Sequence, residues 1–458
     1  MSMMTMLVVA ASAGLVNASG WVEPPEAVVD RLRAGVSGER LLADVQTLAD
    51  FGTRHTLSDT ESDDRGIGAA RRWLKAEFAR IALDAGRDDV VVSFDTHMVQ
   101  ADGRRIGRDV DVVNVMCTIP GAMPEARDRL YYVIAHYDSR ASDVNDAEID
   151  SPGANDDASG TAACLELARL LMRERLDATV VLMPVAGEEQ GLFGARKHAA
   201  AAVEAGLDVR AVLSNDVIGD PSGPGGRMAA DRVRVFSEGL PLTLLAEPGR
   251  AERALRTMRS VASESDSESR QVARFMAEIA DEHDLPVKPM LIYRPDRFLR
   301  GGDHTAFNEV GYPAVRLTEV YEDYDRQHQD VRNESGRQFG DLVEYIDAEY
   351  LAGVTLLNAV TLAHMANAPS GPGDARVIVA ELTNDTTLRW EASPEPDVAG
   401  YEVVWRATDA GDWEHARDVG NVTEATVDLS KDNWFFGVRA YDADGYRSPI
   451  VFPRPARE

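Results

Sequence analysis

Three largely apolar runs constrain the fold of this chain most: LYYVIA at 130–135, TVVLMPVA at 179–186 and VRAVLSND at 209–216. Apolar runs of this kind are typical of strands inside a sheet that is covered on both faces. The sequence predicts one helix that begins at Asp157 or Ala158 and another from Gly191 to about Val203. We therefore expect an α/β fold with a mixed, largely parallel central sheet and helices on both faces.

Metal-binding side chains follow each of these runs. His136 comes directly after the first run, and Asp216 ends the third. Glu188 and Glu189 follow the second run. Because open α/β sheets bind their ligands at the carboxyl ends of the strands, these side chains should lie at one edge and form one site.

Two further motifs complete a set of metal ligands. Asp156 stands in PGANDDASG, and His304 stands in GGDHTAF. Two imidazoles and three carboxylates are the nitrogen and oxygen donors that a pair of zinc ions needs, and one spare glutamate supplies a base. Such a pair polarises a carbonyl and lowers the pKa of a bound water. The motifs therefore predict a hydrolase with two zinc ions per chain.

Composition excludes several partners. The chain has 458 residues with 44% hydrophobic content, which exceeds one usual domain. Its net charge of -29 should repel nucleic acid and anionic membrane faces. Cys117 and Cys164 are predicted to be buried thiols rather than a disulfide. We expect peptide substrates, no nucleic acid and no membrane insertion, and the sequence leaves the oligomeric state open.

The N-terminus carries a short apolar run, MLVVAASAGLV at 6–16, followed by small residues. This pattern predicts a signal peptide over residues 1–18, cleaved near Ala18, and a secreted or periplasmic protein. The preceding residues contain no lysine or arginine, which a signal peptide normally has. The alternative is an N-terminal tail that is retained.

The motifs resemble those of the dizinc exopeptidases, which include bacterial leucine aminopeptidases and glutamate carboxypeptidases. The similarity covers about residues 40–365. It is carried by His136-Tyr137-Asp138, residues 153–160 (GANDDASG), residues 187–191 (GEEQG), Asn215-Asp216 and Gly302-Asp303-His304.

The resemblance implies a role for each metal ligand. His136 and Asp216 hold one zinc ion, whereas Glu189 and His304 hold the other. Asp156 bridges the two ions, since a carboxylate has two oxygens.

The resemblance also names the group that moves protons. Glu188 is the general base, which takes a proton from the attacking water and returns it to the leaving amine. Asp138 could accept the second ring proton of His136 and fix its tautomer. The family often has a cis peptide between the paired aspartates, here Asp156 and Asp157.

The end of the peptide that is recognised is less constrained. Four arginines surround His304 and could clamp a substrate carboxylate: Arg294, Arg297, Arg300 and Arg316. Four nearby acids could receive an α-ammonium group instead: Glu319, Glu322, Asp323 and Asp330. On resemblance we favour an aminopeptidase.

Other interpretations stay open. A metallo-carboxypeptidase similar to glutamate carboxypeptidase is the alternative, and a non-catalytic, receptor-like zinc protein is a further one. His328 in RQHQD resembles a Tyr-His element of many relatives, although the usual proline and threonine are absent. It is interpreted either as a pocket residue or as a surface histidine.

The chain divides into two predicted domains. The exopeptidase domain covers residues 19–368 and closes with a long helix from Phe339 to about Met365. A Pro/Gly-rich linker follows at 369–375. Short strand-like runs over 376–456 resemble a fibronectin type III β-sandwich, which we interpret as a separable accessory module.

Overall fold

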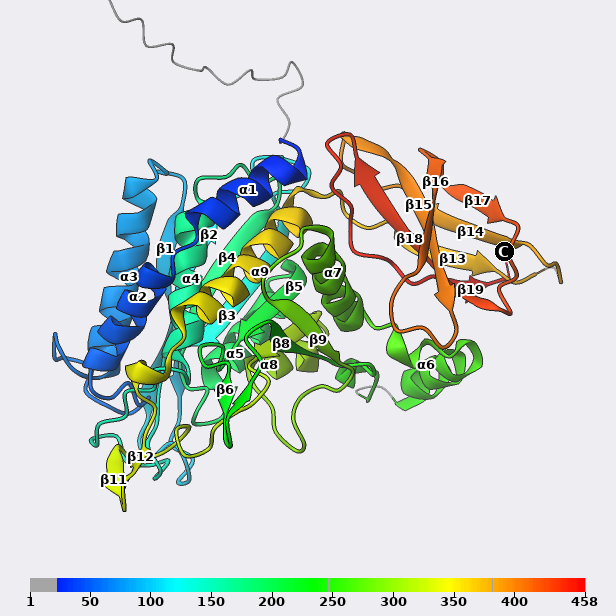
Figure 1. Ribbon diagram of the computed structural model, residues 1–458. Helices are drawn as coiled ribbons and strands as arrows, with labels where there is room; N and C mark the ends of the chain where they lie inside the picture. The colour runs from blue at the N-terminus through cyan, green and yellow to red at the C-terminus, as the bar shows by residue number, and fades with distance from the viewer. Residues whose placement is uncertain (1–22, 246–247, 381, 458) are drawn as a thin grey trace, which may run out of the picture.

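The computed structural model describes residues 23–245, 248–380 and 382–457 (Figure 1). The predicted signal peptide lies outside these ranges. Within them, no helix combines the length and the apolar character that crossing a bilayer requires.

A mixed sheet of eight strands forms the centre of the larger domain, in the order β1-β2-β4-β3-β5-β10-β8-β9. The four central strands β4, β3, β5 and β10 are parallel to one another. On one side β2 is antiparallel to both β4 and β1, and on the other side β8 is antiparallel to β10 and parallel to β9. The α/β prediction is therefore confirmed. The strand bounds are β1 Val91–Val99, β2 Val110–Ile119, β3 Arg129–His136, β4 Thr179–Val185, β5 Asp208–Asn215, β8 Arg232–Ser237, β9 Lys288–Ile292 and β10 Ala314–Thr318.

Helices cover both faces of this sheet, as the apolar strands predict. On β3, Tyr131, Val133 and Ala135 pack into one hydrophobic cluster, with residues of α1–α4, α7 and α9. Tyr132 and Ile134 alternate to the opposite face and pack with α5 and α8. The helix bounds are α1 Pro25–Gly35, α2 Gly38–Asp50, α3 Gly66–Asp84, α4 Ala158–Leu171, α5 Phe193–Glu204, α6 Pro248–Val261, α7 Glu268–Glu282, α8 Asp303–Val310 and α9 Ala348–Asn367.

The helix that ends this domain is shorter than predicted. Phe339 belongs to the strand β12, and α9 begins only at Ala348. Asp347 caps α9, because its carboxylate accepts hydrogen bonds from the backbone N–H groups of Glu349 and Tyr350. Gly340 has a φ of 110°, a left-handed conformation that a continuous helix cannot contain.

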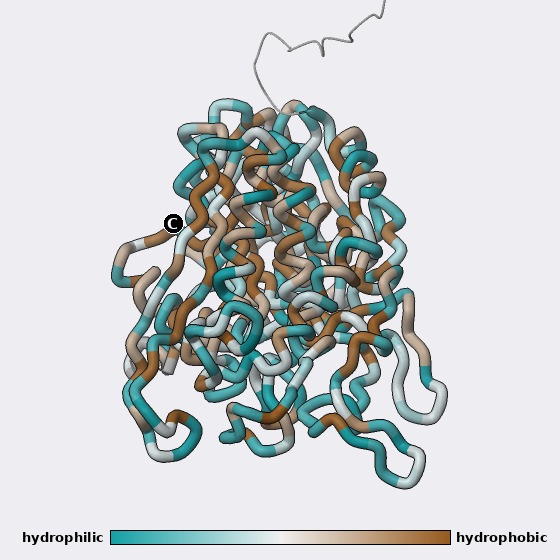
Figure 2. Tube along the Cα trace, turned by 90° about the vertical axis from the view of Figure 1, so that its left-hand side faces the viewer, coloured by the Kyte–Doolittle hydropathy of each residue, from teal (hydrophilic) through white to brown (hydrophobic). Residues whose placement is uncertain are grey.

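Two small hairpins project beyond the sheet. One pairs β6 (Ser222–Gly223) with β7 (Arg227–Met228), and the other pairs β11 (Arg332–Glu334) with β12 (Arg337–Phe339). Both lie at the lower edge in Figure 1. Figure 2 shows that apolar segments concentrate inside the molecule, whereas the chain in the lower loops is mostly hydrophilic.

The C-terminal part is all-β. A sheet of four strands, β17-β14-β13-β19, faces a sheet of three, β16-β15-β18. Residues of both sheets share one hydrophobic cluster, which includes Leu388, Trp390, Tyr401 and Val438. The fibronectin type III assignment stays a prediction. The strand bounds are β13 Gly373–Ile378, β14 Thr386–Glu391, β15 Val398–Ala407, β16 His415–Gly420, β17 Glu424–Val427, β18 Trp434–Asp442 and β19 Arg454–Ala456.

Buried ion pairs join this all-β part to the α/β domain. Arg406 donates two hydrogen bonds to Asp266, at 2.8 and 3.0 Å. Arg129, the first residue of β3, donates to Glu395 at 2.8 Å, and the two side chains are only 4% and 2% exposed. These buried ion pairs connect the two parts directly.

Replacing Glu395 by alanine leaves Arg129 buried without its carboxylate. Because removing one partner of a buried ion pair costs about 3–5 kcal/mol, we expect the free energy of unfolding to fall by about 3 kcal/mol. Glu391→Ala, at an exposed position on β14, should change it by no more than about 0.5 kcal/mol. Urea unfolding followed by circular dichroism measures both, and equal midpoints for Glu395→Ala and the unaltered protein would contradict the expectation.

Candidate metal centre

Five predicted site residues meet at the carboxyl edge of the parallel strands. His136 is the last residue of β3, Asp216 directly follows β5, and Glu188 and Glu189 follow β4. Asp156 lies in the loop that leads into α4. The strand order places these loops side by side, which confirms that the apolar runs bring their polar ends together.

The start of α4 fixes the Asp156 loop. Asp157 caps the helix by accepting a hydrogen bond from the Gly160 backbone N–H at 3.0 Å. The other carboxylate oxygen of Asp157 accepts from the backbone N–H of His136 at 3.1 Å. The peptide bond between Asp156 and Asp157 is cis, as the family resemblance implies.

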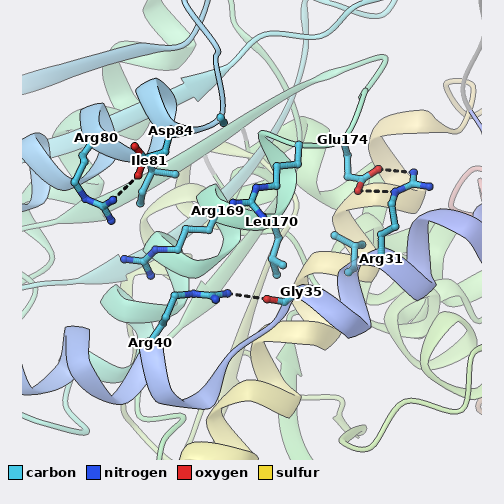
Figure 3. Close-up of a pocket in the computed structure, with 12 residues that line it drawn as sticks. Arg31, Gly35, Arg40, Arg80, Ile81, Asp84, Arg169, Leu170 and Glu174 are labelled. Atoms are coloured by element: carbon cyan, nitrogen blue, oxygen red, sulfur yellow. Dashed lines mark hydrogen bonds and ion pairs between the residues drawn. The ribbon is translucent and has the colours of Figure 1, made fainter. Parts of the chain in front are cut away.

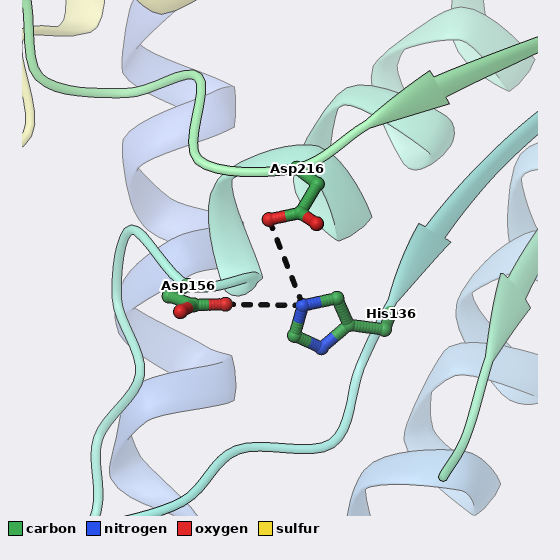
Figure 4. A group of neighbouring side chains, drawn as sticks. All are labelled: His136, Asp156 and Asp216. Carbon is green, nitrogen blue, oxygen red and sulfur yellow. Dashed lines mark ion pairs between the residues drawn. The ribbon is translucent and has the colours of Figure 1, made fainter. Parts of the chain in front are cut away.

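The first group of metal donors contains His136, Asp156 and Asp216, all buried (Figure 4). His136 Nε2 lies 3.0 Å from Asp156 Oδ1 and 3.8 Å from Asp216 Oδ1. Burial lowers the pKa of His136, but the hydrogen bonds to these two carboxylates raise it well above its usual range. The two carboxylates therefore stabilise a positive charge at His136 Nε2, whether a proton or a metal ion carries it.

The second group contains Asp156, Glu189 and His328. His328 Nε2 lies 2.9 Å from Asp156 Oδ2 and 3.1 Å from Glu189 Oε1. Burial opposes protonation, yet Glu189 and Asp156 raise the pKa of His328 to about 10. Asp156 presents Oδ1 to the first group and Oδ2 to the second, so one carboxylate belongs to both.

The structure does not support His304 as a ligand. Its ring is fully buried at the start of α8 and lies outside both donor groups, and Nε2 is 2.8 Å from the carbonyl oxygen of Pro295. His328 stands in the second donor group instead. Its sequence signal is the RQHQD element, which resembles the Tyr-His element of many relatives.

Asp138 acts differently from the prediction. His136 Nδ1 lies 3.0 Å from the backbone carbonyl oxygen of Asp138, whereas the nearest Asp138 carboxylate oxygen is 3.7 Å away. The carboxylate instead accepts hydrogen bonds from the backbone N–H groups of Glu188 and Glu189, at 3.3 and 3.2 Å. Asp138 thus fixes the ring through its main chain and both glutamates through its side chain.

Glu188 is a half-buried carboxyl group beside the two donor groups. Burial raises its pKa well above the usual range, and Glu189 and Asp216 add to that effect, while His136 opposes it. A carboxyl group with a raised pKa is suited to exchanging protons near neutral pH.

Most of the four arginines predicted to surround His304 pair with acidic side chains of the protein. Arg316 is fully buried, with Nη1 3.0 Å from Asp296 and Nη2 3.0 Å from Asp216. Arg297 bonds to Glu322 at 2.5 Å. These two guanidinium groups are therefore engaged within the protein and not free to clamp a substrate carboxylate.

A separate cavity of about 350 Å³ lies among the N-terminal helices and α4 (Figure 3). Its arginines face carboxylates of the protein. Arg31 bonds to Glu174 at 2.7 Å, and Arg80 bonds to Asp84 at 2.5 Å. Five arginines and two acids line this cavity, and none of its lining residues belongs to the metal-donor groups.

The donor set fits zinc. Both groups offer imidazole nitrogen and carboxylate oxygen, which are usual zinc ligands. Glu189 Oε1 is buried, and its contact with His328 Nε2 at 3.1 Å lacks the geometry of a hydrogen bond, so a cation between the two groups would satisfy both.

Comparison with known proteins agrees with this chemistry. The model of peptidase family M28 matches residues 114–229. A probable zinc metalloprotease of Leptosphaeria maculans is 44% identical over 438 residues, which cover 95% of this chain and 99% of that protein. The chain belongs to peptidase family M28. It is a zinc metallopeptidase of that family.

Further comparisons extend over most of the chain. A probable zinc metalloprotease of Pyricularia oryzae is 42% identical over 437 residues, covering 94% of this chain and 85% of that protein. The LapA aminopeptidase of Legionella pneumophila has a TM-score of 0.52 at 18% identity, with 75% of each chain covered. At that identity the likeness shows the fold alone.

Matched substitutions separate the two candidate histidines of this M28 peptidase. We expect His328→Gln to lose one equivalent of bound zinc, because its ring faces Asp156 and Glu189. His304→Gln should retain the zinc content of the unaltered protein, because its ring faces the Pro295 carbonyl. Elemental analysis after buffer exchange measures both, and zinc loss confined to His304→Gln would reverse the assignment.

Proposed function

We propose that this M28 peptidase is an aminopeptidase with two zinc ions per chain. The observation that supports two ions is the shared carboxylate, since Asp156 lies 3.0 Å from His136 and 2.9 Å from His328 through different oxygens. Asp216 completes the first group and Glu189 completes the second. A pair of ions bridged by one carboxylate fits this arrangement.

Hydrolysis of a peptide bond at this site requires two proton transfers, the first from the attacking water to a base and the second from that base to the leaving amine. Zinc in such a site lowers the pKa of water and polarises the scissile carbonyl. Glu188 accepts the proton of the attacking water at its carboxylate and donates it to the nitrogen of the leaving amine. Asp138 holds the Glu188 and Glu189 backbone in place for this transfer. No covalent intermediate with the protein is needed.

The charges beside the site favour the free amino end of a peptide. Six carboxylates and one arginine, Arg326, line a small cavity next to Asp156. Arg326 pairs with Asp220 and Asp323, and the surplus of negative charge that remains favours an α-ammonium group nearby. In contrast, Arg316 and Arg297 are engaged with acids of the protein.

A carboxypeptidase is the second candidate function. Arg300 supports it, because its side chain is 36% exposed and its Nη1 is 3.6 Å from Glu322, which leaves part of the guanidinium accessible.

Export is a further proposal, which rests on the apolar run at 6–16 and small residues before Gly20. N-terminal sequencing of the protein from its source tests it, and retention of residues 1–18 would count against it.

Glu188→Gln keeps the shape of the side chain and removes its basicity. Because a general acid–base group contributes typically about 10²–10⁴-fold, we expect kcat to fall by that factor. Zinc content should stay unchanged, since Glu188 is outside both donor groups. Steady-state kinetics and elemental analysis on one preparation measure both, and near-normal turnover would exclude Glu188 as the base.

Peptides blocked at one end identify the recognised terminus. With zinc-loaded protein, we expect stepwise loss of N-terminal residues from a free peptide and from its C-terminal amide. N-terminal acetylation should abolish cleavage, because it removes the ammonium charge. Mass spectrometry of the products shows from which end residues are lost. Stepwise loss from the carboxyl end would favour the carboxypeptidase instead.

A further inference from the structure

The loop that carries Asp156 lies between two buried side chains of opposite charge. Arg54 is 0% exposed and Asp341 is 6% exposed. They come from distant parts of the sequence, and both contact the main chain of residues 152–156. Neither side chain belongs to the donor groups described above.

Arg54 binds the carbonyl oxygens on one side of the loop. Its Nη1 donates to Pro152 at 2.5 Å, and its Nη2 donates to Gly153 at 2.8 Å. Nε donates to the carbonyl oxygen of Tyr137, next to His136. Burial lowers the pKa of Arg54 to about 10, so the guanidinium remains charged at neutral pH.

Asp341 binds the amide groups on the other side. Both of its carboxylate oxygens lie 2.9 Å from the backbone nitrogen of Asn155, and Oδ2 accepts from the backbone N–H of Asp156 at 2.7 Å. Within the described ranges, no arginine, lysine or histidine side chain hydrogen-bonds to this carboxylate. Arg54 is instead the cation that attracts it across the loop.

We infer that Asp341 and Arg54 are positioning residues that set the place of the Asp156 carboxylate for both donor groups at once. The inference rests on the proposed dinuclear site. Because Asp156 gives Oδ1 to one group and Oδ2 to the other, a shift of its backbone changes both groups together. Loss of Asp216 changes only the first group.

Asp341→Asn is the direct test. An asparagine has one acceptor oxygen and one NH₂ group. The NH₂ group replaces one of the two acceptor oxygens, so one donor would face another donor, the backbone N–H of Asn155. Substitution of groups that orient metal ligands typically costs about 10–100-fold in metal affinity. We expect a loss of about this size in both zinc-binding steps.

Two variants make the result specific. Asp216→Asn should weaken one step and leave the other within about threefold. Asp44→Asn removes a buried carboxylate that pairs with Arg169 at 2.6 Å between α2 and α4. It should lower thermal stability and leave both zinc affinities unchanged, which separates positioning from general destabilisation.

The experiment is a zinc titration of the full chain against a chromophoric chelator, together with melting temperatures with and without zinc. Loss of both steps in Asp341→Asn, with a smaller zinc-induced rise in melting temperature, supports the inference. Two unchanged affinities overturn it. If Asp341→Asn does not fold, Arg54→Lys tests the same loop, because lysine keeps the charge but cannot reach both Pro152 and Gly153 in the same fork.

The proposed function is tested independently of the positioning roles of Asp341 and Arg54. If the unaltered protein binds two zinc ions and cleaves no peptide, the aminopeptidase proposal is wrong, and the affinity comparison still decides the roles of Asp341 and Arg54. If it binds a single ion, the dinuclear proposal and this inference are both overturned.

Discussion

The concentration of buried negative charge at one edge of the sheet is the constraint on which the rest of the structure depends. Asp138, Asp216 and Glu189 are buried within a few residues of strand ends, and Asp156 is buried in the loop that leads into α4. An ionised carboxylate in such surroundings costs several kcal/mol unless positive charge or hydrogen bonds compensate it. The raised pKa values of His136 and His328 favour protonated imidazoles as that charge in the metal-free protein, and bound zinc would supply it in their place. Metal binding should therefore release protons, as it does wherever ligands must be deprotonated.

Most of the fold and most of the metal centre could be predicted from the sequence, for the same reason. A strand covered on both faces is apolar along its whole length, so the sequence marks its ends at the points where polar residues begin. This rule placed His136 and Asp216 at one edge, and the structure brings them into one donor group. It could not place His328, which lies 10 residues beyond the end of β10 at Thr318 in a segment without regular structure. The ring direction in such a loop depends on contacts, and the carbonyl of Pro295 that captures His304 cannot be recognised in the sequence.

Hydrogen bonds to the main chain explain the other differences. The sequence suggested that Asp138 contacts His136 through its carboxylate, but the extended backbone brings the carbonyl oxygen closer to the ring. The roles of Arg54 and Asp341 could not be predicted either. Both act on backbone groups, which every sequence contains, so no side-chain partner indicates them. Charged residues that organise a loop through its main chain leave almost no pattern in the sequence.

The pairing of Arg129 with Glu395 has a consequence for how the chain is made. Arg129 begins the strand that ends in His136, and its carboxylate partner follows 266 residues later. A chain that emerges from the ribosome with its N-terminus first exposes β3 long before Glu395 has been synthesised. The central strand of the peptidase domain therefore reaches its final electrostatic environment only when the β-module has been translated.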